Sequence, residues 1–139
     1  MHPRSEFLQR LRSAIGLPYR WGADGPTAYD CSGLMCACLG VEDTTAQGLY
    51  AEHRDHEVPH VRRPGQLVFY GRDTKHITHV MASLLCWDHG YWILVGARGG
   101  NQDTQTVHDA ARVSALVDVV VHQRYRYHEV VAVIDPWGD

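Results

Sequence analysis

The sequence lacks the features that mark a membrane, secreted or nucleic-acid-binding protein. It has no uninterrupted apolar run of about 18 residues, so we expect no membrane-spanning helix and no membrane partner. Residues 1–16 form an amphipathic pattern without the apolar core of a signal peptide, which predicts a product made in the cytoplasm. The formal net charge of -3 argues against a broad basic surface, so we also expect no nucleic-acid partner.

Internal repeats, low-complexity tracts and interdomain linkers are also absent from the sequence. Its 139 residues, 45% hydrophobic and 21% charged, are typical of one globular unit, so we expect a single domain over residues 1–139. Cysteine is scarce, with four residues in all. Cys31, Cys36 and Cys38 fall on one predicted helix, where disulfide geometry is poor, so reduced thiols are expected.

Helix patterns dominate the first half of the chain. Apolar spacing within residues 5–15 predicts an amphipathic helix, and residues 44–53 predict another short one. Residues 17–30 are rich in glycine, proline and aspartate, which indicates a loop with defined turns. The stretch "CSGLMCACLG", residues 31–40, is apolar and ends in glycine, so it predicts a buried helix with Asp30 at its N-cap.

Strand patterns follow in the second half. Runs rich in β-branched and aromatic residues cover residues 66–71, 77–87, 91–97, 117–123 and 129–135. The turn "DHG" at residues 88–90 predicts a hairpin over residues 77–97. Helices followed by strands predict an α+β fold, with N-terminal helices packed on a C-terminal antiparallel sheet.

The stretch "YDCSG", residues 29–33, contains a candidate nucleophile. Cys31 at the start of a helix would lie near unpaired N–H groups and the positive end of the helix dipole, which favour the thiolate. Gly33 would let a substrate backbone approach, and the small Ser32 would leave the sulfur accessible. His79 lies within a predicted apolar strand, where a polar ring is costly without a partner, so it is the candidate base. On the residues alone, a buried structural thiol and a core histidine bonded to a carbonyl remain open.

The segments "PYRWGADGPTAYDCSGL", "RPGQLVFYGR" and "ITHVMASL" together resemble the NlpC/P60 family of cysteine peptidases over roughly residues 17–100. The resemblance implies a papain-like fold, in which a helix carrying the cysteine packs against a sheet carrying the histidine. It makes Cys31 the nucleophile and His79 the general base. It requires neither a metal nor an organic cofactor.

The resemblance also implies a cell-wall substrate. Family members typically cut peptidoglycan stem peptides at the bond between γ-D-glutamate and the following diamino acid. By this resemblance Tyr19 places its hydroxyl beside the nucleophile, and Asp30 and Ser32 help to hold a free amine of the substrate. Trp21 and Thr78 complete the candidate substrate-binding residues.

Four positions depart from the family pattern. Gln66 stands where the family usually has aspartate, Thr78 replaces a serine, and Met81 replaces a glycine and could narrow the cleft beside His79. The fourth departure is Gly96, which falls where the family has a third polar residue that orients the base.

A glycine side chain cannot orient an imidazole, so another group is needed for this role. The candidates are Asn101, Gln102 and His89, together with a water molecule or a backbone carbonyl. If none of them serves, the site is weakened.

Other functions also remain open. The chain could be a binding or structural module such as a phage tail component, or an amidase or acyltransferase acting on another amide. The ending "VVAVIDPWG" resembles compact phage-type members, which implies delivery to the wall by a phage tail, a holin or a secretion system.

Two local patterns could suggest a metal ion or a nucleic acid as a ligand, but in each case we expect no such site. His53, His56 and His60 lack the companion spacing of a zinc motif, so we expect no metal site there. The basic and aromatic stretch "QRYRYHE", residues 123–129, flanks a strand and stands alone, so we do not expect it to bind nucleic acid.

Overall fold

The computed structural model describes residues 1–138, in which helices precede strands as predicted. The first helices are α1 (Arg4–Ala14), α2 (Cys31–Leu39) and α3 (Ala46–His53), followed by a short 3-10 helix (Arg54–His56). Within the second half, α4 (Val107–Val113) follows the hairpin, and another 3-10 helix (Tyr127–Glu129) precedes the last strand. No helix in this range is long and apolar enough to cross a membrane.

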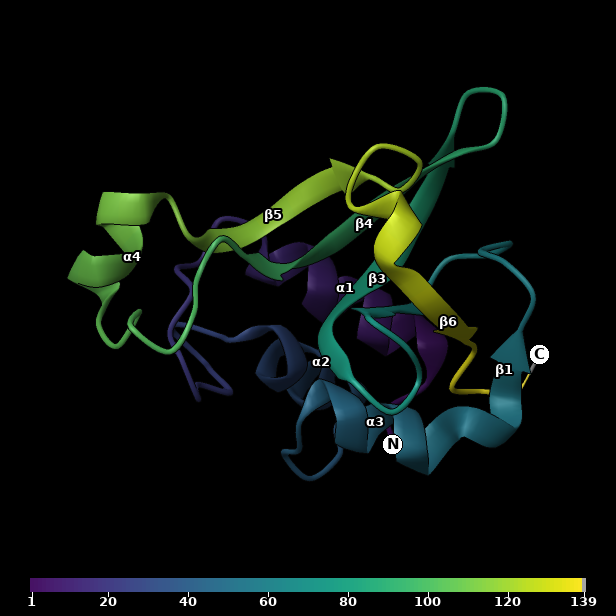
Figure 1. Cartoon of the computed structure of the whole chain (residues 1–139), viewed down its shortest axis with the longest axis horizontal. Helices are drawn as coiled ribbons and strands as arrows, with labels where there is room; N and C mark the ends of the chain where they lie inside the picture. The colour runs from purple at the N-terminus through teal and green to yellow at the C-terminus, as the bar shows by residue number, and fades with distance from the viewer. Residues whose placement is uncertain (139) are drawn as a thin grey trace.

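The strands form one antiparallel sheet in the order β1-β6-β2-β3-β4-β5. Their bounds are β1 (Glu57–Val58), β2 (Leu67–Gly71), β3 (Ile77–Trp87), β4 (Tyr91–Arg98), β5 (Leu116–Val121) and β6 (Val130–Ile134). Figure 1 shows α4 apart from the other helices, at the end of the molecule beyond β5. The expected α+β arrangement is therefore confirmed.

Helix α2 begins and ends where its sequence predicts. The Asp30 carboxylate accepts a hydrogen bond from the Gly33 N–H at 2.6 Å, which caps the helix start. At the other end Gly40 takes up the left-handed conformation, with φ of 74°, and stops the helix. These two signals place Cys31 at the first position of a helix whose remaining residues are mostly buried.

Strand β3 is buried on both faces over its central part. Val80 and Ala82 face the helices, in a core that includes Phe7 of α1 and Leu34 of α2. Met81 points to the opposite face, where a second cluster contains Val58, Val61, Val68, Tyr70, Leu94 and Val133. A strand held from both sides is a rigid support for His79, which lies two residues from its start.

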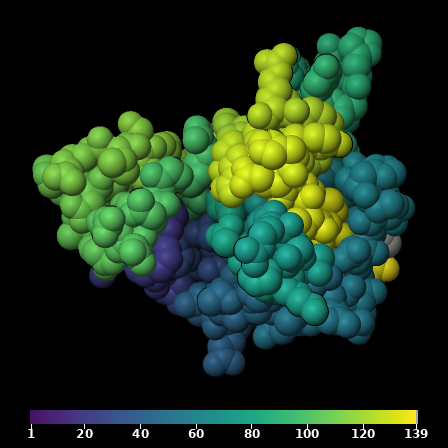
Figure 2. All heavy atoms as spheres, viewed as in Figure 1, coloured from purple at the N-terminus to yellow at the C-terminus, as the bar shows by residue number. Residues whose placement is uncertain are grey.

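The predicted hairpin over residues 77–97 is confirmed. Strands β3 and β4 pair up to Trp87 and Tyr91, and the turn between them contains Asp88 and His89 in the left-handed conformation. The tip of this hairpin projects beyond the body of the molecule (Figure 2). The sequence patterns missed β1, which is very short, and α4, although its capping box of Thr106 and Asp109 is a recognisable signal.

Gln66, one of the departures from the family pattern, has a structural role. It is fully buried; its Oε1 accepts from the Arg62 N–H at 2.8 Å and its Nε2 donates to the Asp135 carboxylate at 3.1 Å. The same carboxylate is paired with Arg4 at 2.9 Å. The amide therefore joins the turn before β2 to the C-terminal end of β6 by donating and accepting at once, whereas an ionised carboxylate can only accept.

Candidate active site

A pocket of about 430 Å³ lies where the start of α2 meets the start of β3 and the end of β4. The sequence-predicted residues that line it are Cys31, His79, Tyr19, Trp21, Asp30, Ser32, Thr78 and Asn101. The structure thus brings the candidate nucleophile, the candidate base and all the candidate substrate-binding residues to one cavity. Arg98, Arg126 and Tyr125 also line it, although the sequence did not indicate them.

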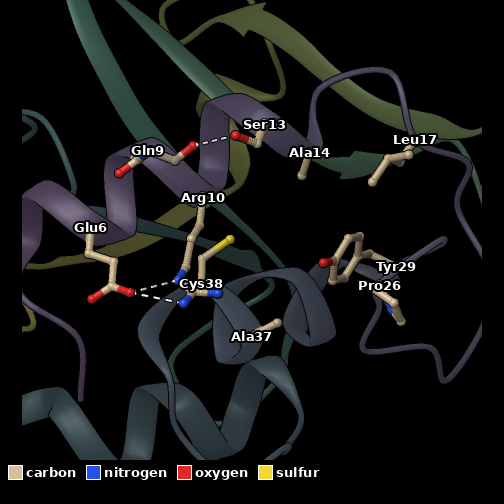
Figure 3. A pocket seen from close by; sticks show the side chains of 10 residues that line it. All are labelled: Glu6, Gln9, Arg10, Ser13, Ala14, Leu17, Pro26, Tyr29, Ala37 and Cys38. Carbon is tan, nitrogen blue, oxygen red and sulfur yellow. Dashed lines mark hydrogen bonds and ion pairs between the residues drawn. The ribbon is translucent and has the colours of Figure 1, made fainter.

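A second groove, of about 420 Å³, lies between α1 and α2 (Figure 3). Glu6 and Arg10 form an ion pair across one side of it, and the Cys38 sulfur is nearby. Burial raises the pKa of Cys38 to about 12, and no histidine lines this groove. Cys38 therefore has no candidate base beside it, whereas Cys31 and His79 line one pocket.

Asp30 fixes the loop that precedes Cys31. One of its carboxylate oxygens accepts from Gly33 of the helix, and the other accepts from the Gly22 N–H at 3.0 Å. Gly33 has a different role from the one that the sequence suggested, because the Ala23 carbonyl occupies the space that its Cβ would need. The glycine thus lets the loop, and not a substrate, approach the helix.

Cys31 is partly buried where it lines the pocket. Burial, and then the negative charge of Asp30, raise the pKa of Cys31 to about 11, although backbone hydrogen bonds from Val80 and Ser32 act in the opposite direction. The expectation that the helix start favours a thiolate is therefore wrong for the unliganded site. The cause is that burial disfavours the charged form more strongly than the helix terminus favours it.

His79 is also buried and uncharged. Only 7% of its surface is exposed, and its Nε2 lies 3.1 Å from the Tyr125 hydroxyl oxygen. Burial, with the positive charges of Arg126 and Arg98, lowers the pKa of His79 to about 3, against an opposing effect of Glu129. The unliganded pocket therefore holds a neutral thiol and a neutral imidazole.

The three candidates for the residue that orients His79 lie in different places. His89 is in the hairpin turn, paired with Asp88 at 3.2 Å and largely exposed, so it is far from the pocket. Gln102 does not line the pocket. Asn101 does, but its Oδ1 accepts the Asp103 N–H at 2.8 Å. Within residues 1–138, no hydrogen bond joins any of the three to His79.

Tyr125 makes that contact instead. It belongs to the stretch "QRYRYHE" and lies 46 residues after His79 in the chain. No local pattern indicates this partner, because the connection between β5 and β6 reaches His79 only through the fold. From its residue types alone, that stretch resembles only a basic and aromatic nucleic-acid pattern.

Met81 does not narrow the pocket. It is fully buried on the face opposite the helices, and its sulfur occupies the space that a Cβ at Gly96 would need. The expectation that it constricts the cleft beside His79 is therefore wrong. The small Gly96 and the large Met81 fill one site in the core together.

Tyr19 and Trp21 form one wall of the pocket. Tyr19 is 5% exposed, and its ring packs so closely on Gly100 that a Cβ there would collide with it. Burial and the nearby Cys31 and Asp30 raise the pKa of Tyr19, so its hydroxyl stays protonated. Trp21 is half exposed, and its backbone N–H donates to the Thr104 carbonyl at 2.7 Å. An aromatic edge of the pocket is thereby tied to the loop after β4.

No group of three or more histidine, cysteine, aspartate or glutamate residues within residues 1–138 is arranged to hold a metal ion. His56, from the histidine-rich stretch, places its Nδ1 3.3 Å from the Pro136 carbonyl.

Comparison with known proteins agrees with this geometry. The NlpC/P60 family matches residues 16–134, most of the chain. The chain belongs to the NlpC/P60 family. A probable endopeptidase of Corynebacterium glutamicum is 70% identical over 27 residues, which cover 19% of this chain and 13% of that relative. The chain therefore spans only a small part of the relative's length.

Solved structures of the family share the fold over nearly the whole chain. The NlpC/P60 domain of the peptidoglycan hydrolase SagA is 20% identical with a TM-score of 0.64, and the match covers 96% of this chain and 99% of that domain. RipD from Mycobacterium tuberculosis, described as a non-catalytic protein adapted to peptidoglycan binding, is 19% identical with a TM-score of 0.62, over 97% and 98% of the two chains. At these identities the likeness concerns the fold alone.

Proposed function

We propose that this protein is a cysteine peptidase that hydrolyses peptidoglycan stem peptides through Cys31 and His79. The observation that carries the proposal is their common pocket, which both Cys31 and His79 line. Family membership supports the reaction class. The SagA likeness supports the fold in which such a hydrolysis takes place.

In the first half of the reaction, the Cys31 sulfur attacks the amide carbonyl carbon while its proton passes to His79. The carbonyl electrons move to oxygen, and the oxyanion is held by the backbone N–H groups at the start of α2, which have no partner inside the helix. When this intermediate collapses, the C–N bond breaks and His79 gives its proton to the leaving amine. The acyl group remains on sulfur as a thioester.

In the second half, His79 takes a proton from a water molecule as its oxygen attacks the thioester carbon. The C–S bond then breaks, the sulfur regains the proton from His79, and the new carboxylic acid leaves. Because both residues are neutral at rest, the proton moves during attack and is not transferred beforehand. His79 has to be neutral for this, and its low pKa ensures that it is.

The amine end of the substrate belongs beside Asp30 and Ser32. The Asp30 carboxylate accepts from Gly22 and Gly33, and the Ser32 hydroxyl lies 3.5 Å from it, so negative charge and a hydroxyl meet beside the nucleophile. A free amino group fits this chemistry. An amino group bound there would place the bond after γ-D-glutamate at the Cys31 sulfur. Thr78 and Trp21 line the same cavity.

The test is cleavage of purified stem-peptide fragments, with products identified by mass spectrometry. We expect release of the diamino acid as a new N-terminus, complete loss of cleavage in Cys31→Ala, and unchanged cleavage in Cys86→Ala. Cys86 is a suitable control because it is an exposed cysteine at the far end of β3. Cleavage retained by Cys31→Ala would overturn the proposal, and products cut at another amide would point to an amidase or acyltransferase.

A second candidate function is peptide binding without cleavage. The observation that favours it is the raised pKa of Cys31, which keeps the sulfur as the less nucleophilic thiol in the unliganded site. Under this hypothesis, wild-type protein and Cys31→Ala would bind a stem peptide with the same affinity in calorimetry, and neither would release a product. Cleavage of a stem peptide by the wild type would contradict this second function.

A further inference from the structure

Tyr125 belongs to a cluster of three rings beside the pocket. Its ring centroid lies 5.9 Å from that of His79 and 5.6 Å from that of Tyr70, and the His79 and Tyr70 centroids are 5.3 Å apart. Tyr70 is fully buried in β2, directly across from His79 in the sheet register. The imidazole therefore packs against two tyrosine rings that also contact each other, and together they restrict its rotation.

Two arginines hold the ring of Tyr125 in turn. The Arg98 guanidinium lies 5.7 Å from the ring centroid and is itself held by Asp118 at 2.8 Å. The Arg126 guanidinium lies 6.0 Å from the centroid and is held by Glu129 at 2.9 Å. Guanidinium groups near an aromatic face are attracted to it. The hydroxyl of Tyr125 is thus held at His79 by contacts on several sides.

A neutral imidazole carries its proton on one nitrogen only, and the choice decides whether His79 can act on Cys31. With the proton on Nδ1, Nε2 would have the free lone pair and would accept from the Tyr125 hydroxyl. With the proton on Nε2, the ring donates to the hydroxyl oxygen, and Nδ1 is free to take the thiol proton. The second arrangement is the one that the proposed reaction requires.

We propose that Tyr125 is the positioning residue of His79, and that its hydroxyl oxygen accepts the Nε2 proton, which leaves the Nδ1 lone pair free to act as the base for Cys31. This inference rests on the proposed function for its purpose, but it concerns a property of the unliganded protein. Tyr125 thereby takes the role of the third polar residue that the family resemblance leads us to expect at position 96, and it comes from the connection between β5 and β6.

The matched variants are Tyr125→Phe and Tyr127→Phe. The first removes the hydroxyl at His79 and keeps the ring, whereas Tyr127 is 55% exposed and its ring contacts His122. One neutral hydrogen bond is worth about 0.5–1.5 kcal/mol, so we expect kcat to fall about 2- to 12-fold in Tyr125→Phe, with KM nearly unchanged. Tyr127→Phe should match the wild type in both.

Two measurements on the unliganded protein test this inference without any substrate. Long-range proton–nitrogen NMR correlations, assigned by comparison with His79→Gln, should show the Nε2–H tautomer in the wild type and in Tyr127→Phe. In Tyr125→Phe we expect a mixture of tautomers. Alkylation of Cys31 by iodoacetamide near neutral pH should slow in His79→Gln and, to a smaller extent, in Tyr125→Phe.

The outcomes separate this inference from the proposed function. If the wild type cleaves stem peptides but its His79 carries the proton on Nδ1, or if Tyr125→Phe keeps the tautomer and kcat, the positioning role is overturned and the peptidase stands. If no stem peptide is cleaved but the tautomer depends on Tyr125, the positioning role stands and the substrate is wrong. Should Tyr125→Phe fail to fold, the wild-type tautomer alone decides.

Discussion

The sulfur of Met81 fills the space that any side chain at position 96 would enter. The family resemblance leads us to expect a glycine at position 81 and a polar residue at position 96, whereas this chain has a large residue at 81 and a glycine at 96. The departures at positions 81 and 96 are therefore the two sides of one packing contact. A polar group at position 96 is excluded by volume, and the hydrogen bond to His79 comes from Tyr125 instead.

This exchange predicts strong coupling between the two positions. Gly96→Ala should destabilise the protein by about 1–3 kcal/mol through overpacking, and Met81→Ala by about 2–5 kcal/mol through a cavity. In the double variant the added methyl enters the vacated space, so the total loss should be at least about 1 kcal/mol below the sum. Denaturant unfolding measures all of these.

Met35→Ala provides the control for that cycle. Met35 is equally buried but belongs to the core on the helix side, away from Gly96. Its combination with Gly96→Ala should be additive within about 0.5 kcal/mol. Additivity of Met81→Ala with Gly96→Ala would show that the contact is not energetically coupled.

Replacing Gln66 by glutamate tests the buried amide. The variant loses the N–H that donates to Asp135 and places a second carboxyl group 3.1 Å from it, so we expect a loss of about 2–4 kcal/mol near neutral pH. Protonation of either carboxyl restores a donor, so the deficit should shrink as the pH falls. Gln9→Glu, on the exposed face of α1, should change stability little. A deficit that is constant with pH would exclude the carboxylate pair as its cause.

Acid should destabilise the protein through His79. The pKa of this group is lowered to about 3 in the folded protein, so the unfolded chain binds the proton more tightly. The contribution of neutral His79 to the free energy of unfolding is therefore fully present above pH 6.5. It is lost as the pH falls from 6.5 toward 3, by about 1.4 kcal/mol for each pH unit. In His79→Gln this contribution is absent, so the difference between the two pH profiles isolates it. Parallel profiles would mean that His79 is solvated.

Cys31 should react with iodoacetamide as a weakly acidic thiol. Since its pKa is raised to about 11 by burial and by Asp30, the alkylation rate should still rise with pH beyond the ordinary range of a free cysteine. Asp30→Asn keeps a capping side chain but removes the charge, so it should shift this profile to lower pH. Peptide mapping by mass spectrometry separates Cys31 from the other cysteines. A plateau reached below neutral pH would mean that a thiolate is already present.

Local patterns predicted the framework of the site. The Asp30 cap, the glycine after α2 and the turn at residues 88–90 are short-range signals, and each of them works within a few residues of the chain. For this reason the start of α2 and the hairpin that carries His79 were predictable. The common pocket of Cys31 and His79 then follows from packing that helix on that sheet.

The sequence by itself determined the elements and the reactive residue types, because capping, turns and hydrophobic periodicity are local properties of the chain. Only the tertiary structure decided their chemical state. Whether Cys31 and His79 are charged depends on how much water and which charges surround them, and Arg126 comes from a distant connection. The partner of His79 and the pairing of Met81 with Gly96 are likewise contacts between separate strands and loops. Such contacts depend on volume and distance in the folded protein, which no short stretch of sequence specifies.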